Sequence, residues 1–459
     1  MAENITAIID ELHQLNISSL VGDIDVDQLD ILLNSYLGSC RLLAYTSPEE
    51  IRRTQRVLGR SIAIYASRKS PVYANRIDVS LLNREDCLDA ISGDFLVSKF
   101  DLMDKDLWYT DDFASTENST SGTTGSPFRY KIWNDAFTPI EKEMHYGSLL
   151  EEFGITGDIG VLNMVSGQAA KGYRTVNHGQ AKIQVAQGDE IANYVARIHC
   201  GHGSSEARMH SMVFDEAAYF HIKDYCNFVV QYCQENKIDV LLGSGGLFEL
   251  LCTHFITNEP SGFPRLCQVL SNTGDRANLD TLEFLIEVGI ASDWCDHMRC
   301  WDGGVSFFTC KHHTYHLMDE LSYVYSDSEN RMRSVDFFSY PSPFINYWNG
   351  DYAQVADEYK KCQCGRWYRP FKFLSRRPRS NRSGGGYYDS QKVHHHLSQQ
   401  YDVKFVSYQD NFISVEDSTL TEETKAGIVS DMAKERIAVQ FFTQKNLRAF
   451  SSSGKATTP

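Results

Sequence analysis

Over residues 4–89 the apolar positions of the chain recur with a helical period. Two stretches, Ile8 to Leu15 and Leu29 to Leu37, place isoleucine and leucine at intervals of three and four residues. Positions at these intervals lie on one side of an α-helix, so each stretch predicts a helix whose apolar side packs against the core.

From about Asp94 onward the pattern changes to short apolar runs separated by longer amphipathic stretches. The runs span residues 159–165, 238–242, 265–270 and 290–294. Runs of this length predict buried strands, and their alternation with helical stretches predicts a layered α/β body.

A second change in composition occurs between Arg366 and Gly386, where arginine and glycine are abundant. A short segment of mixed character follows and extends to Pro459. We interpret the Arg/Gly-rich stretch as a hinge that leads to a small C-terminal domain.

Composition and charge narrow the classes of function. The 459 residues are 42% apolar and 23% charged, which is typical of a globular protein with two or three domains. The 44 basic and 60 acidic side chains give a formal net charge of −16, which argues against partners such as nucleic acid or an anionic membrane surface.

The chain has no apolar run of the roughly 18 residues that a transmembrane helix needs. Its first residues, Met1 to Ile5, lack the basic and apolar regions of a signal peptide. The twelve cysteines are scattered, as is typical of reduced thiols, so we expect a cytoplasmic protein.

The segment Ser119–Pro127 has the sequence Ser-Thr-Ser-Gly-Thr-Thr-Gly-Ser-Pro. Glycines allow backbone N–H groups to approach an anion, and hydroxyl groups add further donors. The segment lacks the Gly-Lys-Ser/Thr ending of a Walker loop. Composition alone favours a solvated linker, but the order of the residues favours a phosphate-binding loop.

That order, Ser-Gly-Thr-Thr-Gly-x-Pro, resembles the phosphate-loop signature of the adenylate-forming superfamily, which includes acyl-CoA synthetases, firefly luciferase and the adenylation domains of peptide synthetases. Four downstream segments resemble further motifs of this superfamily and follow in the same order. They are Leu270–Arg276, Met298–Gly304, Tyr347–Asp351 and Ser452–Lys455.

Within the superfamily the chain is most similar to phenylacetate-CoA ligase-like proteins, through residues 95–103, residues 153–159 and the sequence Cys362-Gln-Cys364-Gly-Arg366. The resemblance implies an α/β fold with a large multi-layer N-terminal adenylation domain at residues 1–375, of which 1–92 form a helical lead-in. It also implies a small α+β C-terminal domain at residues 376–459, on a hinge.

The resemblance implies ATP as substrate and a role for each matched residue. Residues implied to bind the nucleotide are Ser121, Gly122, Thr123, Thr124 and Gly125 at the phosphates, Gly274, Asp275 and Arg276 at the adenine, and Asp351 and Arg376 at the ribose. Asp302 would bind Mg²⁺. Lys455 would supply positive charge at the reacting carboxylate and α-phosphate.

Two close pairs, Cys310 with His316 and Cys362 with Cys364, form a candidate metal site. Thiolate and imidazole suit tetrahedral Zn²⁺. Some proteins of the ligase group that the chain resembles have such a zinc, so we expect a structural Zn²⁺ with four protein ligands. Competing ligands are His312, His313 and Cys300, and the alternative is four residues without a metal.

The chain also departs from the superfamily pattern. Asp302 replaces a glutamate, Trp301 precedes it in place of threonine, and Met298 replaces tyrosine. Phe128 follows the phosphate loop where many members have lysine. Pro378 lies in the expected hinge, and proline restricts the backbone, so we expect the domain rotation of the superfamily to be altered or lost.

The hinge region is basic, and two interpretations stay open. Its guanidinium groups could bind the phosphates of CoA or of a carrier-protein arm, or they could be solvated. The basic residues are Arg366, Arg369, Lys372, Arg376, Arg377, Arg379 and Arg382.

The expected function is ATP-dependent activation of a small acid as an acyl-adenylate, followed by transfer to a thiol or amine acceptor: CoA, a carrier protein or a free amine. Polar residues from Lys171 to His202 favour a small polar acid, and the altered pocket favours specialised biosynthesis. The alternative is a degenerate homologue that binds nucleotide or a partner without turnover.

Overall fold

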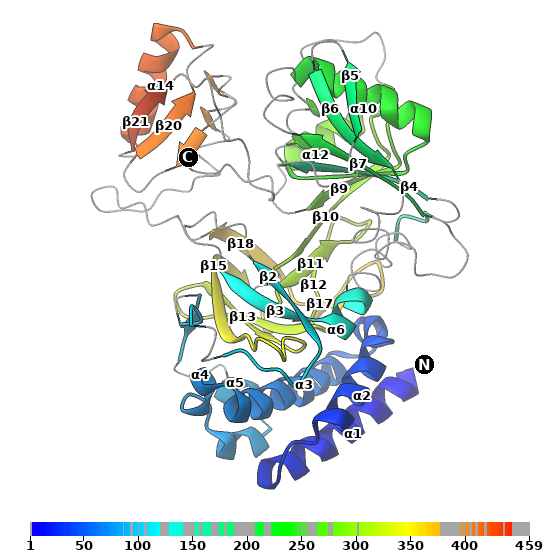
Figure 1. The fold of residues 1–459 in the computed structure, drawn as a ribbon, viewed down its shortest axis with the longest axis vertical. Coiled ribbons are helices and arrows are strands. Elements are labelled where there is room, and N and C mark those ends of the chain that lie inside the picture. The colour runs from blue at the N-terminus through cyan, green and yellow to red at the C-terminus, as the bar shows by residue number, and fades with distance from the viewer. Residues whose placement is uncertain are drawn as a thin grey trace.

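The computed structural model of the chain describes the following residues: 2–85, 87–91, 95–99, 101–104, 108–119, 128–140, 152–155, 159–166, 174–178, 181–187, 207–214, 222–245, 247–248, 251–252, 255, 264–273, 279–300, 303–376, 396–397, 400–401, 403, 406–408, 412–416, 420–434 and 437–442. The fold is mixed α/β, as the sequence predicts (Figure 1).

The N-terminal region is helical, and the apolar sides of its first two helices are buried as predicted. Asp25 caps one helix by accepting from the Gln28 N–H at 3.0 Å, and Ser47 caps another by accepting from the Glu50 N–H at 3.1 Å. The helices are α1 (Ala2–Val21), α2 (Val26–Leu37), α3 (Pro48–Lys69), α4 (Pro71–Ala74) and α5 (Cys87–Ile91), with 3₁₀ turns at Cys40–Tyr45 and Val79–Asn83.

A nine-stranded sheet forms the second body of the chain. Its strands, in spatial order, are β12 (Tyr315–Leu317), β11 (Ser306–Thr309), β10 (Asp293–Arg299), β9 (Val269–Thr273), β8 (Val240–Gly243), β4 (Ile159–Ser166), β7 (Ala207–Phe214), β6 (Ala181–Gln187) and β5 (Arg174–His178). The strands from β10 to β7 run parallel, and the outer ones are antiparallel.

All four predicted apolar runs lie on or beside strands of this sheet. The observed bounds of β9 and β10 begin later than the predicted runs, because pairing with the neighbouring strand starts at Val269 and Asp293. Helices α10 (Ile222–Asn236) and α12 (Leu279–Glu287) bury their apolar sides in one core with this sheet. Burial on both faces explains why the central strands are apolar runs.

A second sheet packs on the N-terminal helices (Figure 1). Its strands are β1 (Val97–Ser98), β15 (Ile345–Val355), β14 (Arg331–Asp336) and β13 (Ser322–Ser326), and β18 (Phe371–Arg376) also pairs with β15. The Tyr73 hydroxyl donates to the Pro343 carbonyl at 2.8 Å, and the Tyr36 hydroxyl donates to the Glu320 carbonyl at 3.0 Å. These buried contacts fix the helices to this half of the chain.

Two smaller units complete this part of the chain. The hairpin of β2 (Ser115–Ser119) and β3 (Arg129–Trp133) leads into α6 (Asn134–Pro139), and its aromatic residues join the same core as the helices. The short strands β16 (Lys360–Lys361) and β17 (Trp367–Tyr368) pair with each other.

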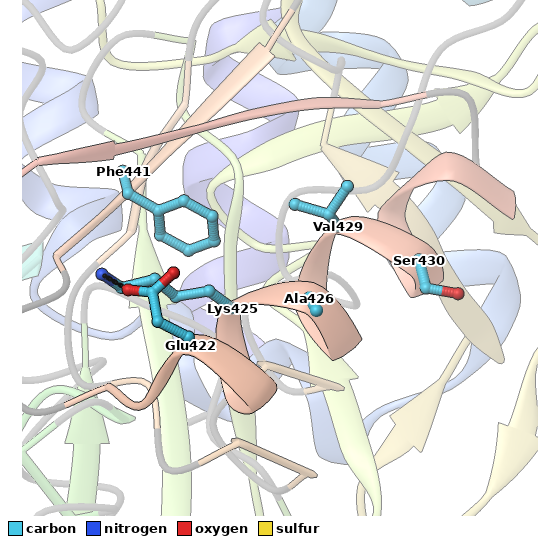
Figure 2. Close-up of a pocket in the computed structure, with 6 residues that line it drawn as sticks. All are labelled: Glu422, Lys425, Ala426, Val429, Ser430 and Phe441. Carbon is cyan, nitrogen blue, oxygen red and sulfur yellow. Dashed lines mark hydrogen bonds and ion pairs between the residues drawn. The ribbon is translucent and has the colours of Figure 1, made fainter.

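The C-terminal elements have a separate hydrophobic core. Strands β19 (Val406–Tyr408), β20 (Phe412–Glu416) and β21 (Ala438–Phe442) form a sheet, which α14 (Glu422–Lys434) covers. Figure 2 shows a shallow pocket between α14 and β21, where Lys425 pairs with Glu422 at 2.9 Å. None of the predicted site residues lines it. The domain boundary at residue 376 stays a prediction.

Within the ranges given above, no helix combines the length and the apolar character that crossing a bilayer requires.

Candidate functional site

The candidate site lies where parallel strands of the large sheet end. Strand β9 ends at Thr273, directly before Gly274, and the neighbouring β10 ends at Arg299, shortly before Asp302. Thr273 and His297 are register partners in this parallel pair. In open α/β sheets ligands bind beyond the carboxyl ends of the strands, so both predicted motifs follow strands that end at the same edge.

Two glycines fix the chain just after Asp302. Gly303 and Gly304 have φ angles of +120° and +71°, which side chains rarely adopt. A Cβ atom on Gly304 would lie 2.3 Å from Cγ of Asp336. The sequence Gly-Gly is therefore required here by both backbone conformation and space.

A bulge in β15 sets the position of Asp351. Trp348 pairs with Arg333 and Tyr352 with Arg331, so the three residues between Trp348 and Tyr352 face the single residue Met332. Gly350 has a φ angle of +103° in this bulge. Bulges re-aim side chains and are frequent beside active sites, and this one turns Asn349 and Asp351 out of the regular strand pattern.

Asp351 and Arg376, the two residues predicted to bind the ribose, are direct register partners on the antiparallel strands β15 and β18. They are separated by 24 positions that include the Cys-x-Cys-Gly-Arg segment, and only the fold brings their backbones together. Asp351 is 3% exposed.

Sequence reasoning missed Asn349. Its amide Nδ2 donates to Oδ2 of Asp351 at 2.9 Å, and its Oδ1 accepts from the Asp351 N–H at 3.0 Å. The same Nδ2 donates to Sγ of Cys300 at 3.6 Å. The signal that could have revealed it is the Asn-Gly dipeptide, because asparagine before glycine is typical of turns in which the amide bonds the backbone two residues on.

The predicted phosphate loop connects the strands of the β2–β3 hairpin, and both of its ends are anchored. Ser119 pairs with Arg129 across the hairpin. Phe128 is 2% exposed and stacks on Trp108 with ring centroids 5.6 Å apart. Phe128 therefore belongs to the core, which accounts for an apolar residue at this position.

Most of the predicted nucleotide residues lie outside the described ranges. These are Ser121, Gly122, Thr123, Thr124, Gly125, Gly274, Asp275, Arg276, Asp302 and Lys455.

The structure brings the four predicted metal ligands together. The donor atoms of Cys310, His316, Cys362 and Cys364 all lie within 4.8 Å of one another. Sγ of Cys310 is 3.8 Å from Sγ of Cys362, and Sγ of Cys364 is 3.5 Å from Nε2 of His316. Of the competing ligands, His313 instead pairs with Asp293 at 2.8 Å, which takes it out of this cluster.

The chemistry of the cluster fits a cation. A hydrogen bond from the Cys364 thiol, together with one from His316, lowers the pKa of Cys310 to about 3, and the same bond raises the pKa of Cys364. Nδ1 of His316 is buried and has no hydrogen-bond partner in the described part of the chain. Thiolates and imidazole converging in this way are a donor set that suits tetrahedral Zn²⁺.

Two buried ion pairs join the segment that follows His316 to the segment that follows Cys364. Arg366 donates to Glu320 at 2.9 Å, and Arg369 donates through Nε to Asp319 at 3.1 Å. Both arginines are 3% exposed. The prediction that they lie in a solvated or phosphate-binding hinge was wrong for these two residues, because acidic side chains neighbouring His316 neutralise them inside the core.

No protein-family model matches the sequence, and no curated protein is similar to it in sequence. Among solved structures, the chain is similar to 2-hydroxyisobutyryl-CoA ligase in the postadenylation state with R3-HIB-AMP, with a TM-score of 0.55 and 13% identity over 91% of this chain and 90% of that one.

A second structure of that ligase, in complex with 2-HIB-AMP and CoA in the thioesterification state, has a TM-score of 0.54 and 13% identity, covering 90% of this chain and 91% of that chain. The similarity spans nearly the full length of both proteins, so the chain shares the fold of that ligase.

Proposed function

We propose that the chain is an ATP-dependent, AMP-forming ligase that activates a small polar carboxylic acid as an acyl-adenylate. The observation that carries this proposal is the register pairing of Asp351 with Arg376, two residues that the sequence resemblance assigns to the ribose on independent grounds. The fold shared with 2-hydroxyisobutyryl-CoA ligase supports it.

In the proposed reaction an oxygen of the acid attacks the α-phosphorus of ATP. A new oxygen–phosphorus bond forms, the bond to the bridging oxygen breaks, and pyrophosphate leaves with that oxygen. Negative charge grows on the phosphoryl oxygens, so fixed donors and cations around them lower the barrier. Residues 121–125 would hold the phosphates, Gly274 to Arg276 the adenine, and Lys455 the reacting centre.

Asp302 is proposed to hold Mg²⁺, because a carboxylate oxygen is the ligand that this hard cation prefers. Bound Mg²⁺ would neutralise charge on the phosphates. In the sequence Asp302 is followed directly by Gly303 and Gly304. Backbone hydrogen bonds of Cys300 with Gly304 and Val305, both 2.8 Å long, fix the described residues on either side of it.

The second half-reaction is proposed to transfer the acyl group to a thiol or amine, with CoA, a carrier protein or a free amine as acceptor. CoA gains support because it is bound in a structure of 2-hydroxyisobutyryl-CoA ligase. We propose that the chain acts in specialised biosynthesis, because Trp301 and Asp302 differ from the threonine and glutamate of the superfamily motif that this segment resembles.

We also propose that Cys310, His316, Cys362 and Cys364 hold a structural Zn²⁺. All four coordination positions would be filled by the protein, which leaves none for a reacting molecule. Cys310 directly follows β11, His316 lies on β12, and Cys362 and Cys364 lie in the turn between β16 and β17. A bound ion would therefore cross-link segments that are distant in the sequence.

The proposal is tested by exchange of labelled pyrophosphate into ATP across a panel of small acids. Exchange with at least one polar acid is expected, and it should be lost in Lys455→Ala but kept in Lys223→Ala, which changes an exposed lysine of α10. Measurable ATP binding without exchange for any acid would favour the degenerate homologue, which the altered Trp301 and Pro378 positions suggest.

A further inference from the structure

We propose that Asn349 is a positioning residue: it orients the carboxylate of Asp351 toward the ribose and joins it to the turn that Cys300 forms with Gly304 and Val305. The inference deepens the proposed function and rests on it. It adds a role for a residue that the matched segment Tyr347–Asp351 contains but to which the resemblance assigns none.

The contacts between Asn349 and Asp351 are reciprocal. The Asn349 amide donates to the Asp351 carboxylate at 2.9 Å and accepts from the Asp351 backbone N–H at 3.0 Å. One bond fixes the side chain of Asp351 and the other fixes its backbone. A hydrogen bond to a charged acceptor is shorter and stronger than a neutral one, so this pair restricts the carboxylate to one orientation.

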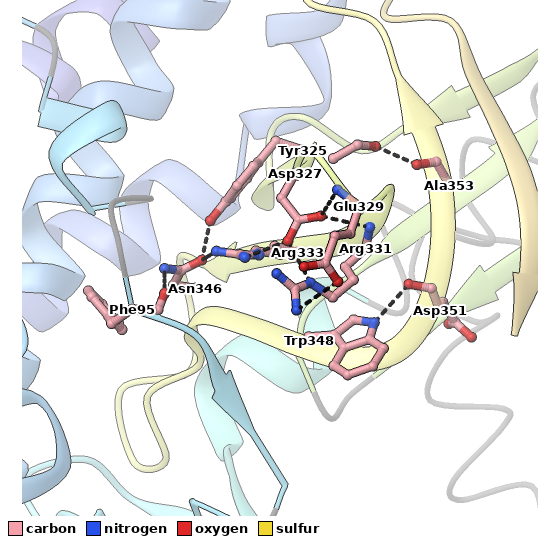
Figure 3. Close-up of polar contacts among 11 residues, drawn as sticks. Phe95, Tyr325, Asp327, Glu329, Arg331, Arg333, Asn346, Trp348, Asp351 and Ala353 are labelled. Atoms are coloured by element: carbon pink, nitrogen blue, oxygen red, sulfur yellow. Dashed lines mark hydrogen bonds and ion pairs between the residues drawn. The ribbon is translucent and has the colours of Figure 1, made fainter. Parts of the chain in front are cut away.

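The backbone around Asp351 is held from its other side as well. The indole of Trp348 donates to the Asp351 carbonyl at 3.0 Å, and the guanidinium of Arg331 lies 5.9 Å from the Trp348 ring centre (Figure 3). Side chains of β15 itself and of the neighbouring strand β14 therefore hold the bulge that contains Asn349 in place.

The start of β15 is fixed by a buried network that Figure 3 also shows. Asn346 has a φ angle of +54°, and its amide donates to the Phe95 carbonyl. Its Oδ1 accepts from Nη1 of Arg333 at 3.3 Å, and Arg333 in turn pairs with Asp327. These contacts fix the backbone at the start of β15. Asn349, three residues further along the strand, therefore has a fixed position from which its side chain can orient Asp351.

Asn349 also reaches the second functional turn. Its Nδ2 donates to Sγ of Cys300 at 3.6 Å, and Cys300 makes backbone hydrogen bonds with Gly304 and Val305, both 2.8 Å long. One amide group therefore links the predicted ribose ligand Asp351 to Cys300, which precedes Asp302 by two residues in the sequence. We therefore expect the loss of Asn349 to disturb both the orientation of the Asp351 carboxylate and the turn at Cys300.

The test measures nucleotide binding by calorimetry, so it does not require that the acid be known. ATP is compared with 2′,3′-dideoxy-ATP, which lacks the hydroxyl groups that Asp351 would bind. The wild-type chain should bind ATP at least about tenfold more tightly, as expected for hydrogen bonds to a charged group. Asp351→Ala should remove this preference.

Asn349→Ala should reduce the same preference to about threefold or less by weakening ATP and leaving the dideoxy nucleotide nearly unchanged. Asn349→Asp retains an acceptor for the backbone N–H and so preserves the turn, but it cannot donate to Asp351 and should lose the preference too. Asn75→Ala, at an exposed asparagine of the helical region, should behave as wild type.

The outcomes separate the two claims. If the wild type binds neither nucleotide, the proposed function fails and the inference fails with it. If the wild type prefers ATP, Asp351→Ala loses the preference and both Asn349 variants keep it, the inference is overturned while the proposed function stands. The inference is also overturned if the Asn349 variants bind ATP and the dideoxy nucleotide more weakly by the same factor. That result would mean that Asn349 only stabilises the conformation of the turn.

Discussion

Arg366 and Glu320 form an ion pair of 2.9 Å whose side chains are only 3% and 2% exposed. The guanidinium also lies over the rings of Tyr45 and Phe308, at 5.2 and 4.9 Å from their centres. The pair joins the turn that carries Cys364 to the strand end that follows His316, and Tyr45 belongs to the helical N-terminal region. It is thus one of the contacts that hold three distant parts of the chain together.

Arg366→Met is expected to lower the free energy of unfolding by about 3–5 kcal/mol, because it leaves the Glu320 carboxylate buried without its partner. Denaturant unfolding measures the change. The matched control is Arg129→Met, whose pair with Glu117 is 60% and 43% exposed, and its expected cost is below about 1 kcal/mol. Equal costs for the two variants would contradict the structural importance of the buried pair.

Asp327 should make stability depend on pH. Burial raises the pKa of Asp327, but hydrogen bonds from Arg331, Glu329 and Arg333 outweigh it and hold that pKa below the ordinary value of 3.8. A depressed carboxyl pKa stabilises the fold above the unfolded-state pKa, and this stabilisation is lost as pH falls through the folded-state pKa.

Asp327→Asn should therefore cost about 1–3 kcal/mol at neutral pH, and the difference from wild type should shrink below about pH 3.8. Urea unfolding at a series of pH values measures it. Glu329→Gln, at a residue 66% exposed, is the control and should show a small difference. A difference for Asp327→Asn that does not change with pH would exclude the ionised carboxylate as its cause.

Purified protein should contain close to one zinc ion per chain by elemental analysis. Cys362→Ser should weaken zinc binding by more than the roughly 10–100-fold that loss of an outer-sphere partner costs, and should lower the melting temperature. Cys300→Ser removes a competing thiol outside the cluster and should retain the zinc. Full zinc content in Cys362→Ser, or none in the wild type, would rule out the proposed site.

Gly304→Ala is expected to destabilise the turn that carries Asp302, since its Cβ would lie 2.3 Å from Cγ of Asp336. Gly289→Ala is the matched control, because Gly289 also has a positive φ angle, +84°, but nothing lies within 4 Å of the added Cβ. The control should cost about 1–2 kcal/mol of backbone strain, and Gly304→Ala clearly more, in thermal unfolding. Similar costs would show that Asp336 can move away freely.

Local patterns predicted the elements of this fold well. The leucine and isoleucine periodicity predicted two helices with a buried side, and the apolar runs predicted strands β4, β8, β9 and β10. Both could be predicted because buried positions are apolar, so burial of one helix side or of both sheet faces determines the hydrophobic pattern of the sequence. The bounds of the strands could not be predicted equally well, since pairing partners determine where each strand begins.

The candidate site was predictable only as far as motifs extend. Resemblance assigned Asp351 and Arg376 to the ribose, and spacing together with resemblance assigned Cys310, His316, Cys362 and Cys364 to a metal. The structure shows that the members of each set are neighbours, and their roles stay predictions. Neither resemblance nor spacing showed that Arg366 and Arg369 are buried, because their acidic partners lie about fifty positions earlier in the chain. Asn349 was missed for a related reason: its role depends on a bulge that arises from strand register.

The central claim is that the acid attacks the α-phosphorus of ATP. The most direct test uses an acid that supports pyrophosphate exchange, labelled with ¹⁸O in its carboxylate, together with ATP and an acceptor. Mass spectrometry of the products should find one ¹⁸O atom in AMP, because the oxygen that bonds to phosphorus leaves with AMP when the acyl group is transferred. Formation of ADP and phosphate, or of AMP without ¹⁸O, would contradict adenylation of the acid.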